Sequence, residues 1–197
     1  MSDLVITAAS FVTAADLPGA RLGNRFGRMD LPSQLSLLAV ENLGVNFDAF
    51  SRDRIGLCLA VRSGSLSTDV EYWRGRDAAG GPSPMLFTYT LPSAPIGEIA
   101  IRHRLTGPDL CLIGDGNAVL AEARDWFRRD EVDGCLCVVC DAVTPATAEM
   151  IQGLPQAEAR ALFLQREGQG ALALRENDRD MKSLCDKILR QQSASAK

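Results

Sequence analysis

Residues 110–127 read LCLIGDGNAVLAEARDWF, and this stretch decides the fold. The apolar run at 110–113 predicts a strand, and the apolar spacing that follows the turn predicts a helix. Between them lies the turn Gly114-Asp115-Gly116-Asn117. A turn that joins a strand to a helix is where α/β proteins place nucleophiles and phosphate-binding loops. This turn contains no serine, cysteine, lysine or histidine, so we interpret it as a site that has lost its reactive group.

Strands and helices alternate on both sides of this turn. Apolar runs predict strands at 4–7, 54–61, 133–143 and 170–174. Helical spacing predicts helices at 31–43, 67–74, 95–105 and 157–163, and Gly107-Pro108 is a stop signal. The alternation indicates the α/β class, with a mostly parallel sheet and helices on its faces. We expect one domain over 1–190 and a disordered tail over 191–197.

Composition excludes several classes of function. The chain has 197 residues and a formal net charge of −4, which argues against binding of nucleic acid or of a membrane surface. The first residues, MSDLVITAASFVTA, carry an acid where a signal peptide needs basic residues. No apolar run approaches the ~18–20 residues of a membrane span. We therefore expect a cytoplasmic protein whose six cysteines are reduced and mostly buried.

Two motifs suggest ligands at first sight. The segment CLCVVC places Cys135 and Cys137 on one face of a strand and Cys140 on the other, so the three thiols cannot converge on one metal ion. The turn Gly114-x-Gly116 follows a strand, as a dinucleotide-binding loop does, but Val119 replaces the third glycine of that motif. The sequence therefore predicts no metal and no cofactor.

His103 is the only histidine, and any Ser-His or Cys-His mechanism would have to use it. It follows Ile96 and Ile99 at helical spacing, beside the apolar stripe of the predicted helix. A partly buried histidine with a packing role is the preferred interpretation, and a catalytic role is the alternative.

Four segments, in order along the chain, resemble the β-ketoacyl synthases. They are GLCLAVRSGSLSTDVEYWR (56–74), YTLPSAPIGEIAIRHRLTGPDLCL (89–112), EVDGCLCVVCDAV (131–143) and REGQGALALRE (166–176). The match is diffuse and is strongest over 91–141. The resemblance implies the N-terminal half of the thiolase fold of condensing enzymes, with element order βαβαβαββ. In that family, a cysteine at the N-terminus of a central helix accepts an acyl group from acyl carrier protein, and two histidines come from the C-terminal half.

The sequence departs from the family pattern at the nucleophile. Counted from Gly107-Pro108, the position of the family's cysteine falls on Gly116; aligned from the strand beyond, it falls on Ile113. Neither alignment supplies a nucleophile, and Cys111 lies inside the predicted strand. The sequence also ends where the family's N-terminal half ends, without the two histidines. The resemblance therefore implies a 3-oxoacyl-ACP synthase relative that does not perform condensation alone.

The first functional hypothesis is a non-catalytic ketosynthase-like accessory subunit, either similar to a chain length factor or a scaffold, in polyketide or specialised fatty-acid biosynthesis. The family resemblance implies a homodimer, or a heterodimer with a full-length ketosynthase, and acyl carrier protein as a further partner. A sheet built to pack against a second half is also expected to expose apolar surface.

Two alternatives remain. One is a module that binds an acyl or pantetheine group between the loop of Ser63 and Ser65 and the turn of Gly114, Asp115, Gly116 and Asn117. The other is a small enzyme of unrecognised chemistry that uses Asp115, Asn117 or His103. Because Asp115 or Asn117 would also cap a helix well, their presence does not require catalysis.

Overall fold

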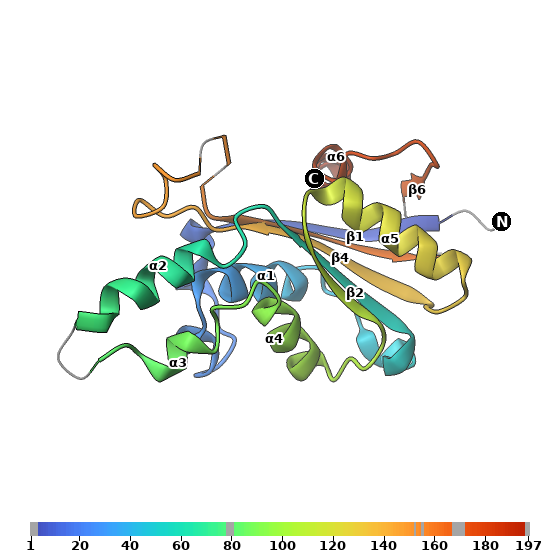
Figure 1. The fold of residues 1–197 in the computed structure, drawn as a ribbon. Coiled ribbons are helices and arrows are strands. Elements are labelled where there is room, and N and C mark those ends of the chain that lie inside the picture. Colours follow the sequence, from blue (N-terminus) through green and yellow to red (C-terminus); the bar gives the residue numbers. More distant parts are fainter. Residues whose placement is uncertain (1–3, 78–80, 152, 155, 167–171, 196–197) are drawn as a thin grey trace.

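The computed structural model describes residues 4–77, 81–151, 153–154, 156–166 and 172–195. In these residues a six-stranded sheet lies between two layers of helices (Figure 1). The strands are β1 (Leu4–Thr13), β2 (Ile55–Val61), β3 (Asp109–Ile113), β4 (Gly134–Asp141), β5 (Glu158–Gln165) and β6 (Leu172–Leu174). The α-helices are α1 (Leu31–Glu41), α2 (Leu66–Arg74), α3 (Pro84–Phe87), α4 (Ala94–His103), α5 (Gly116–Arg128) and α6 (Met181–Ser195).

The sheet has the strand order β3-β2-β4-β5-β1-β6 and is mixed. β2 pairs in parallel with β3 and β4, whereas the β4–β5, β5–β1 and β1–β6 pairs are antiparallel. The α/β class is confirmed. The expectation of a mostly parallel sheet is wrong, because three of the five strand pairs are antiparallel. β5 returns beside β4 without a crossover helix, which only an antiparallel pair allows.

The segment predicted as a helix at 157–163 is the strand β5. Its composition, EARALFLQ, is rich in residues that favour helices. Burial overrides that preference, because Ala161 and Phe163 face one core and Leu162 faces the other. β5 therefore lies beside β4, and the described part of the strand predicted at 170–174 pairs with β1. Residues 167–171 of the segment REGQGALALRE lie outside the described residues, and 172–174 form β6.

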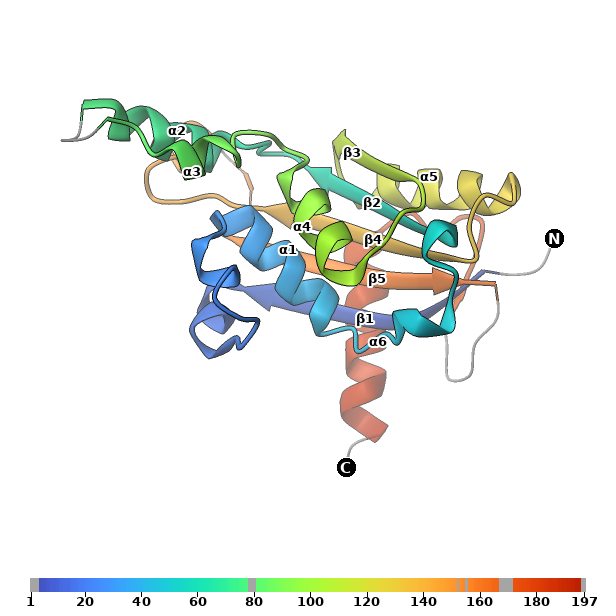
Figure 2. The same ribbon diagram turned by 90° about the horizontal axis from the view of Figure 1, so that it is seen from below.

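Two apolar cores lie on opposite faces of the sheet. Figure 2 shows α1 and α4 on one face, where they pack on side chains such as Leu57 and Leu136. α5 and α6 cover the other face, where Cys135 and Cys137 lie. Cys140 belongs to the first core, so the predicted separation of the three cysteines is confirmed. In the described part of the chain, no group of three or more ligating side chains is placed to hold a metal ion.

The C-terminal helix α6 continues through Ser195. The expected tail at 191–197 is thus helical up to that residue, and residues 196–197 lie outside the described residues. Within the described ranges, no helix has both the length and the apolar character needed to cross a bilayer.

Helix α5 lies close to the sheet because β2 has a glycine beneath it. A Cβ atom placed at Gly56 would lie 2.7 Å from the ring of Trp126, which is buried near the end of α5. We expect Gly56→Ala to lower the free energy of unfolding by about 1–3 kcal/mol, because the rigid ring has to move away. Gly97→Ala is the matched control, since nothing lies within 4 Å of a Cβ at that helical position. Urea denaturation of both variants tests this, and equal stabilities would contradict it.

Candidate functional site

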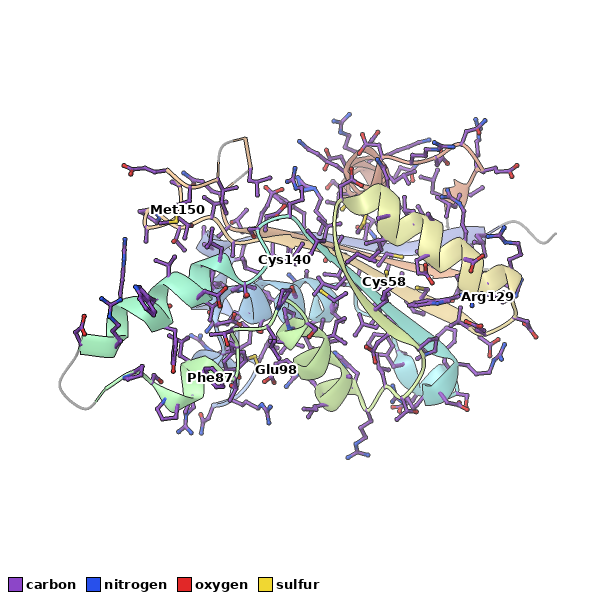
Figure 3. The ribbon with its side chains drawn as sticks, in the orientation of Figure 1. Cys58, Phe87, Glu98, Arg129, Cys140 and Met150 are labelled. Carbon is purple, nitrogen blue, oxygen red and sulfur yellow. The ribbon has the colours of Figure 1, made fainter. Side chains whose placement is uncertain are left out.

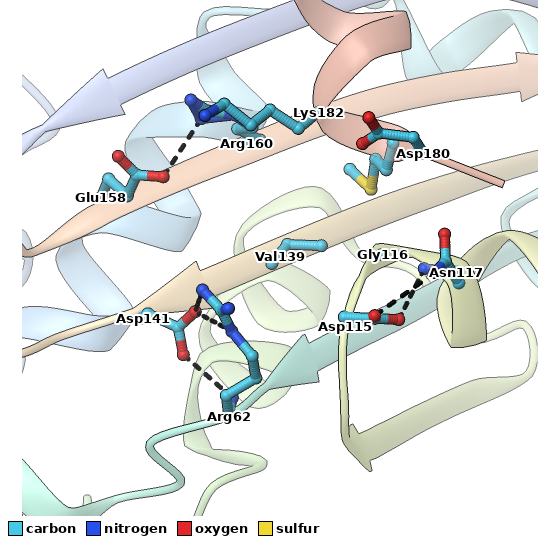
Figure 4. Close-up of a pocket in the computed structure, with 11 residues that line it drawn as sticks. Arg62, Asp115, Gly116, Asn117, Val139, Asp141, Glu158, Arg160, Asp180 and Lys182 are labelled. Carbon is cyan, nitrogen blue, oxygen red and sulfur yellow. Dashed lines mark hydrogen bonds and ion pairs between the residues drawn. The ribbon is translucent and has the colours of Figure 1, made fainter. Parts of the chain in front are cut away.

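A small hollow of about 240 Å³ lies where β2 and β4 end, on the face covered by α5 and α6 (Figure 4). Carboxyl ends of parallel strands are the usual place for ligands in α/β sheets. The lining residues come from β4 and β5, from the residue that follows β2, and from the starts of α5 and α6. They are Arg62, Asp115, Gly116, Asn117, Val139, Asp141, Glu158, Arg160, Asp180, Met181 and Lys182.

Arg62 and Asp141 form an ion pair that ties the ends of β2 and β4 together. Asp141 is 2% exposed, and its Oδ2 lies 2.7 Å from Nη2 of Arg62 and accepts a hydrogen bond from Nε at 2.9 Å. Oδ1 accepts the backbone N–H groups of Arg62 at 2.9 Å and Ser63 at 3.2 Å. All of the carboxylate's bonds therefore go to the loop that leaves β2, and the pair fixes that loop over the sheet.

Neighbouring residues bind some of the other charged groups of the hollow, although the buried Nε of Arg160 has no hydrogen-bond partner among the described residues. Arg160 pairs with Glu158 at 3.2 Å, and its guanidinium stacks on the ring of Phe11 at 4.1 Å. Asp180 accepts the backbone N–H of Ser183 at 3.2 Å and so caps α6. Glu158 and Asp180 are thus committed to contacts within the protein, which favours a structural role for them, whereas the Nε of Arg160 is left without an acceptor.

Asp115 is the N-cap of α5. Its Oδ1 accepts the backbone N–H of Asn117 at 2.9 Å, and its Oδ2 accepts the side-chain amide of Asn117 at 3.3 Å. Gly114 donates its N–H to the carbonyl of Val61 at 3.1 Å, which holds the turn against β2. These contacts account for the turn's polar residues through capping alone.

The structure places Asp115, Gly116 and Asn117 in the hollow but leaves Ser63 and Ser65 outside its lining. Ser63 Oγ accepts the N–H of Ala142 at 3.4 Å. Ser65 Oγ donates to Asp69 at 2.9 Å within the first turn of α2. The Ser63 hydroxyl thus binds the backbone that follows β4 and the Ser65 hydroxyl binds a carboxylate of α2, and their role in a pocket stays a prediction.

Sequence reasoning did not single out Arg62, Asp141, Arg160 or Met181. Arg62 follows the buried strand β2, and Asp141 ends the buried strand β4. The sequence could therefore have predicted that both residues lie at the carboxyl ends of these strands. Arg160 lies in the strand that was taken for a helix, and Met181 begins a helix that was not predicted.

His103 lies on the opposite face of the sheet from this hollow. Its ring packs on Phe47 with the centroids 4.7 Å apart, and Nε2 lies 3.4 Å from a carboxylate oxygen of Glu41. Phe47 belongs to the core under α1 and α4, whereas Asp115 begins α5 on the other face. The two candidates therefore cannot act at one site.

The two candidate nucleophile positions differ in their surroundings. Ile113 ends β3 and is 70% exposed, while Gly116 is the first residue of α5. All six cysteines carry free thiols, and Cys111 is the only one that is not fully buried. Burial raises the pKa of Cys111, that of Cys140 to about 12 and that of Cys185 to about 11. These three thiols therefore stay protonated at neutral pH, and none of them is an activated nucleophile.

Comparison with solved structures identifies the fold. Over 87% of its length this chain superposes on 64% of a chain from the ishigamide ketosynthase/chain length factor, with TM-score 0.68 and 20% identity. It has the ketosynthase fold. It also matches 80% of a chain from the ketosynthase ApeO in complex with its chain length factor ApeC from Xenorhabdus doucetiae, over 85% of its own length, with TM-score 0.65 and 16% identity.

A third similar structure is a type II polyketide synthase acyl-carrier protein in complex with its ketosynthase bound to the hexaketide. This chain covers 62% of that chain with 84% of its own length, at TM-score 0.71 and 14% identity. The chain thus spans less than two thirds of the length of the ishigamide and hexaketide-complex chains that it matches. No protein-family model and no curated protein sequence matches it.

The surroundings of His103 give a test of its packing role. Burial lowers the pKa of His103, and the nearby Glu41 only partly opposes this effect. The unfolded chain therefore binds the proton more readily, and we expect stability to fall as pH drops through about 6.5 towards 5. Glutamine in its place removes the titration, so the difference in Tm between wild type and His103→Gln should shrink as pH falls. A difference in Tm that stays constant from pH 8 to 5 would contradict the prediction.

Proposed function

We propose that this chain is a non-catalytic ketosynthase-like accessory subunit that pairs with a full-length ketosynthase. Two observations support the absence of chemistry. The turn at the start of α5 holds no nucleophile, and its polar residues act as a helix cap. The likeness to ketosynthases solved with chain length factors supports assignment to polyketide or specialised fatty-acid assembly. That assignment rests on analogy of fold.

The observation that carries the proposal is the free edge of the sheet at β3. Among the described residues, β3 pairs with β2 on one side and with no strand on the other. Its sequence, DLCLI, has no lysine or proline to discourage pairing. An unprotected edge strand is a ready template for another chain. Figure 2 shows β3 at one edge of the sheet, and α2 and α3 projecting past the ends of the strands.

Exposed apolar side chains lie on β3 and on the helices and turn that precede it in the sequence. Most of the large apolar residues that the fold leaves in solvent belong to α2, α3, α4, β3 or the turn before α4; they are Trp73, Met85, Phe87, Leu91, Ile101 and Ile113. Exposed apolar groups of this size are typical of a protein interface. The sequence predicted that the sheet would expose apolar surface. Both faces of the sheet are instead covered, one by α1 and α4 and the other by α5 and α6.

The alternative functions have weaker support. The hollow of about 240 Å³ is smaller than the roughly 300–1,000 Å³ of ordinary ligand pockets, which disfavours an acyl-pantetheine site within that hollow. The small-enzyme hypothesis needs Asp115 or His103, which have capping and packing roles on opposite faces. Acyl carrier protein as a further partner and a cytoplasmic location, in keeping with the free thiols, belong to the proposal.

The interface is tested with a pair of matched substitutions. Ile113 at the β3 edge and Met150 in the loop after β4 are 70% and 63% exposed, and Figure 3 shows Met150 in that loop, well away from α3. We expect Ile113→Asp to weaken binding to a co-expressed full-length ketosynthase by at least about tenfold, because a charge would enter a buried interface. Met150→Asp should leave the affinity unchanged. Native mass spectrometry and sedimentation measure both.

Three outcomes would contradict the proposal. A monomer that binds no ketosynthase would overturn the accessory role. A homodimer that excludes the ketosynthase would retain the interface but assign it to a second copy of this chain. Equal weakening by both substitutions would move the interface away from β3.

A further inference from the structure

The first residue of α6 lies directly over the first residue of α5. A Cβ atom placed at Gly116 would lie 2.5 Å from Cβ, 3.3 Å from Cγ and 3.4 Å from Sδ of Met181. Real Cβ atoms essentially never come as close as 2.5 Å. A methionine Cβ is fixed to its backbone and cannot rotate away, so any side chain at position 116 requires α6 itself to move.

Contacts along α6 oppose such a movement. Met181, Leu184, Cys185 and Ile188 are buried in the core that α6 shares with α5. The thiol of Cys185 donates to the carbonyl of Ser10 on β1 at 3.3 Å. The helix is therefore anchored to the sheet beyond its first turn as well as at Met181.

The segment that leads into α6 is also tied to α5. Arg124 on α5 donates to the backbone carbonyls of Arg175 at 2.9 Å and Asp178 at 2.6 Å. Asp180 then caps the new helix through the N–H of Ser183. The chain is thus held on both sides of Met181, and relief of a clash at position 116 would have to break some of these contacts.

We propose that α6 permanently blocks the turn at 114–117. Met181 occupies the space that a side chain on the first residue of α5 would fill. The inference rests on the proposed function in taking position 116 as the counterpart of the ketosynthase nucleophile. It goes further in one respect. A cysteine restored at that position would still be unable to present its thiol to an acyl donor, because the steric block by Met181 is separate from the loss of the nucleophile.

Stability of alanine variants gives the first test. Gly116→Ala introduces the smallest side chain at the blocked position, and Gly114→Ala is its control in the same turn. A Cβ at Gly114 meets only Ala118 Cβ at 3.6 Å, an ordinary contact. We expect Gly116→Ala to lower Tm by at least about 3 °C more than Gly114→Ala does. Equal melting temperatures would overturn the proposal.

Accessibility of a restored thiol gives the second test. Gly116→Cys is combined with Met181→Gly or with Met181→Ala, and each protein is treated with iodoacetamide and analysed by peptide mass spectrometry. In the reaction the thiolate displaces iodide, a sulfur–carbon bond forms, and the thiol proton passes to the buffer. Alkylation at position 116 is read separately from that of the natural cysteines.

A steric block by Met181 predicts a specific order in the alkylation rates of the introduced thiol. The Met181→Gly combination removes the clashing Cβ, so its introduced thiol should react at least about 100-fold faster than that of the Gly116→Cys single variant. The Met181→Ala combination keeps that Cβ and should regain much less. A single variant that reacts as fast as the Met181→Gly combination would refute the proposed block by α6. Both assays use the chain alone, so their outcome is separate from whether a ketosynthase binds.

Discussion

The position of α5 depends on two side chains that press against glycines. Trp126 lies against Gly56 near one end of the helix, and Met181 lies against Gly116 at the other. α5 carries the chain from β3 to β4 across β2, so its distance from the sheet determines how much room remains at the strand ends. Gly116 and Met181 both line the hollow beneath α6, so their close approach limits its size.

Local signals were sufficient for the part of the fold around the turn. An apolar run, two glycines and an aspartate that can cap a helix predict β3, the turn and α5, and all three form where expected. The alternation of Cys135, Cys137 and Cys140 between two cores also follows from strand geometry alone. The packing role of His103 agrees with its place beside an apolar stripe.

Contacts between distant segments account for what sequence reasoning missed. β5 has a composition that favours a helix and becomes a strand because β4 and β1 lie on either side of it. The closeness of Met181 to Gly116 depends on how α6 docks, and no motif in either segment signals it. Ser63 and Ser65 follow β2 as expected, but their hydroxyls bond to nearby groups of the protein instead of lining the hollow.

The place of β1 in the sheet has a consequence for how the chain folds. β1 is synthesised before the other five strands, yet both of its neighbours, β5 and β6, come from the last quarter of the sequence. Pairing across so large a sequence separation is slow, because a long loop has to close first. During synthesis β2, β3 and β4 can pair with one another before the partners of β1 have been made. This first strand is therefore the part of the nascent sheet that stays longest without partners.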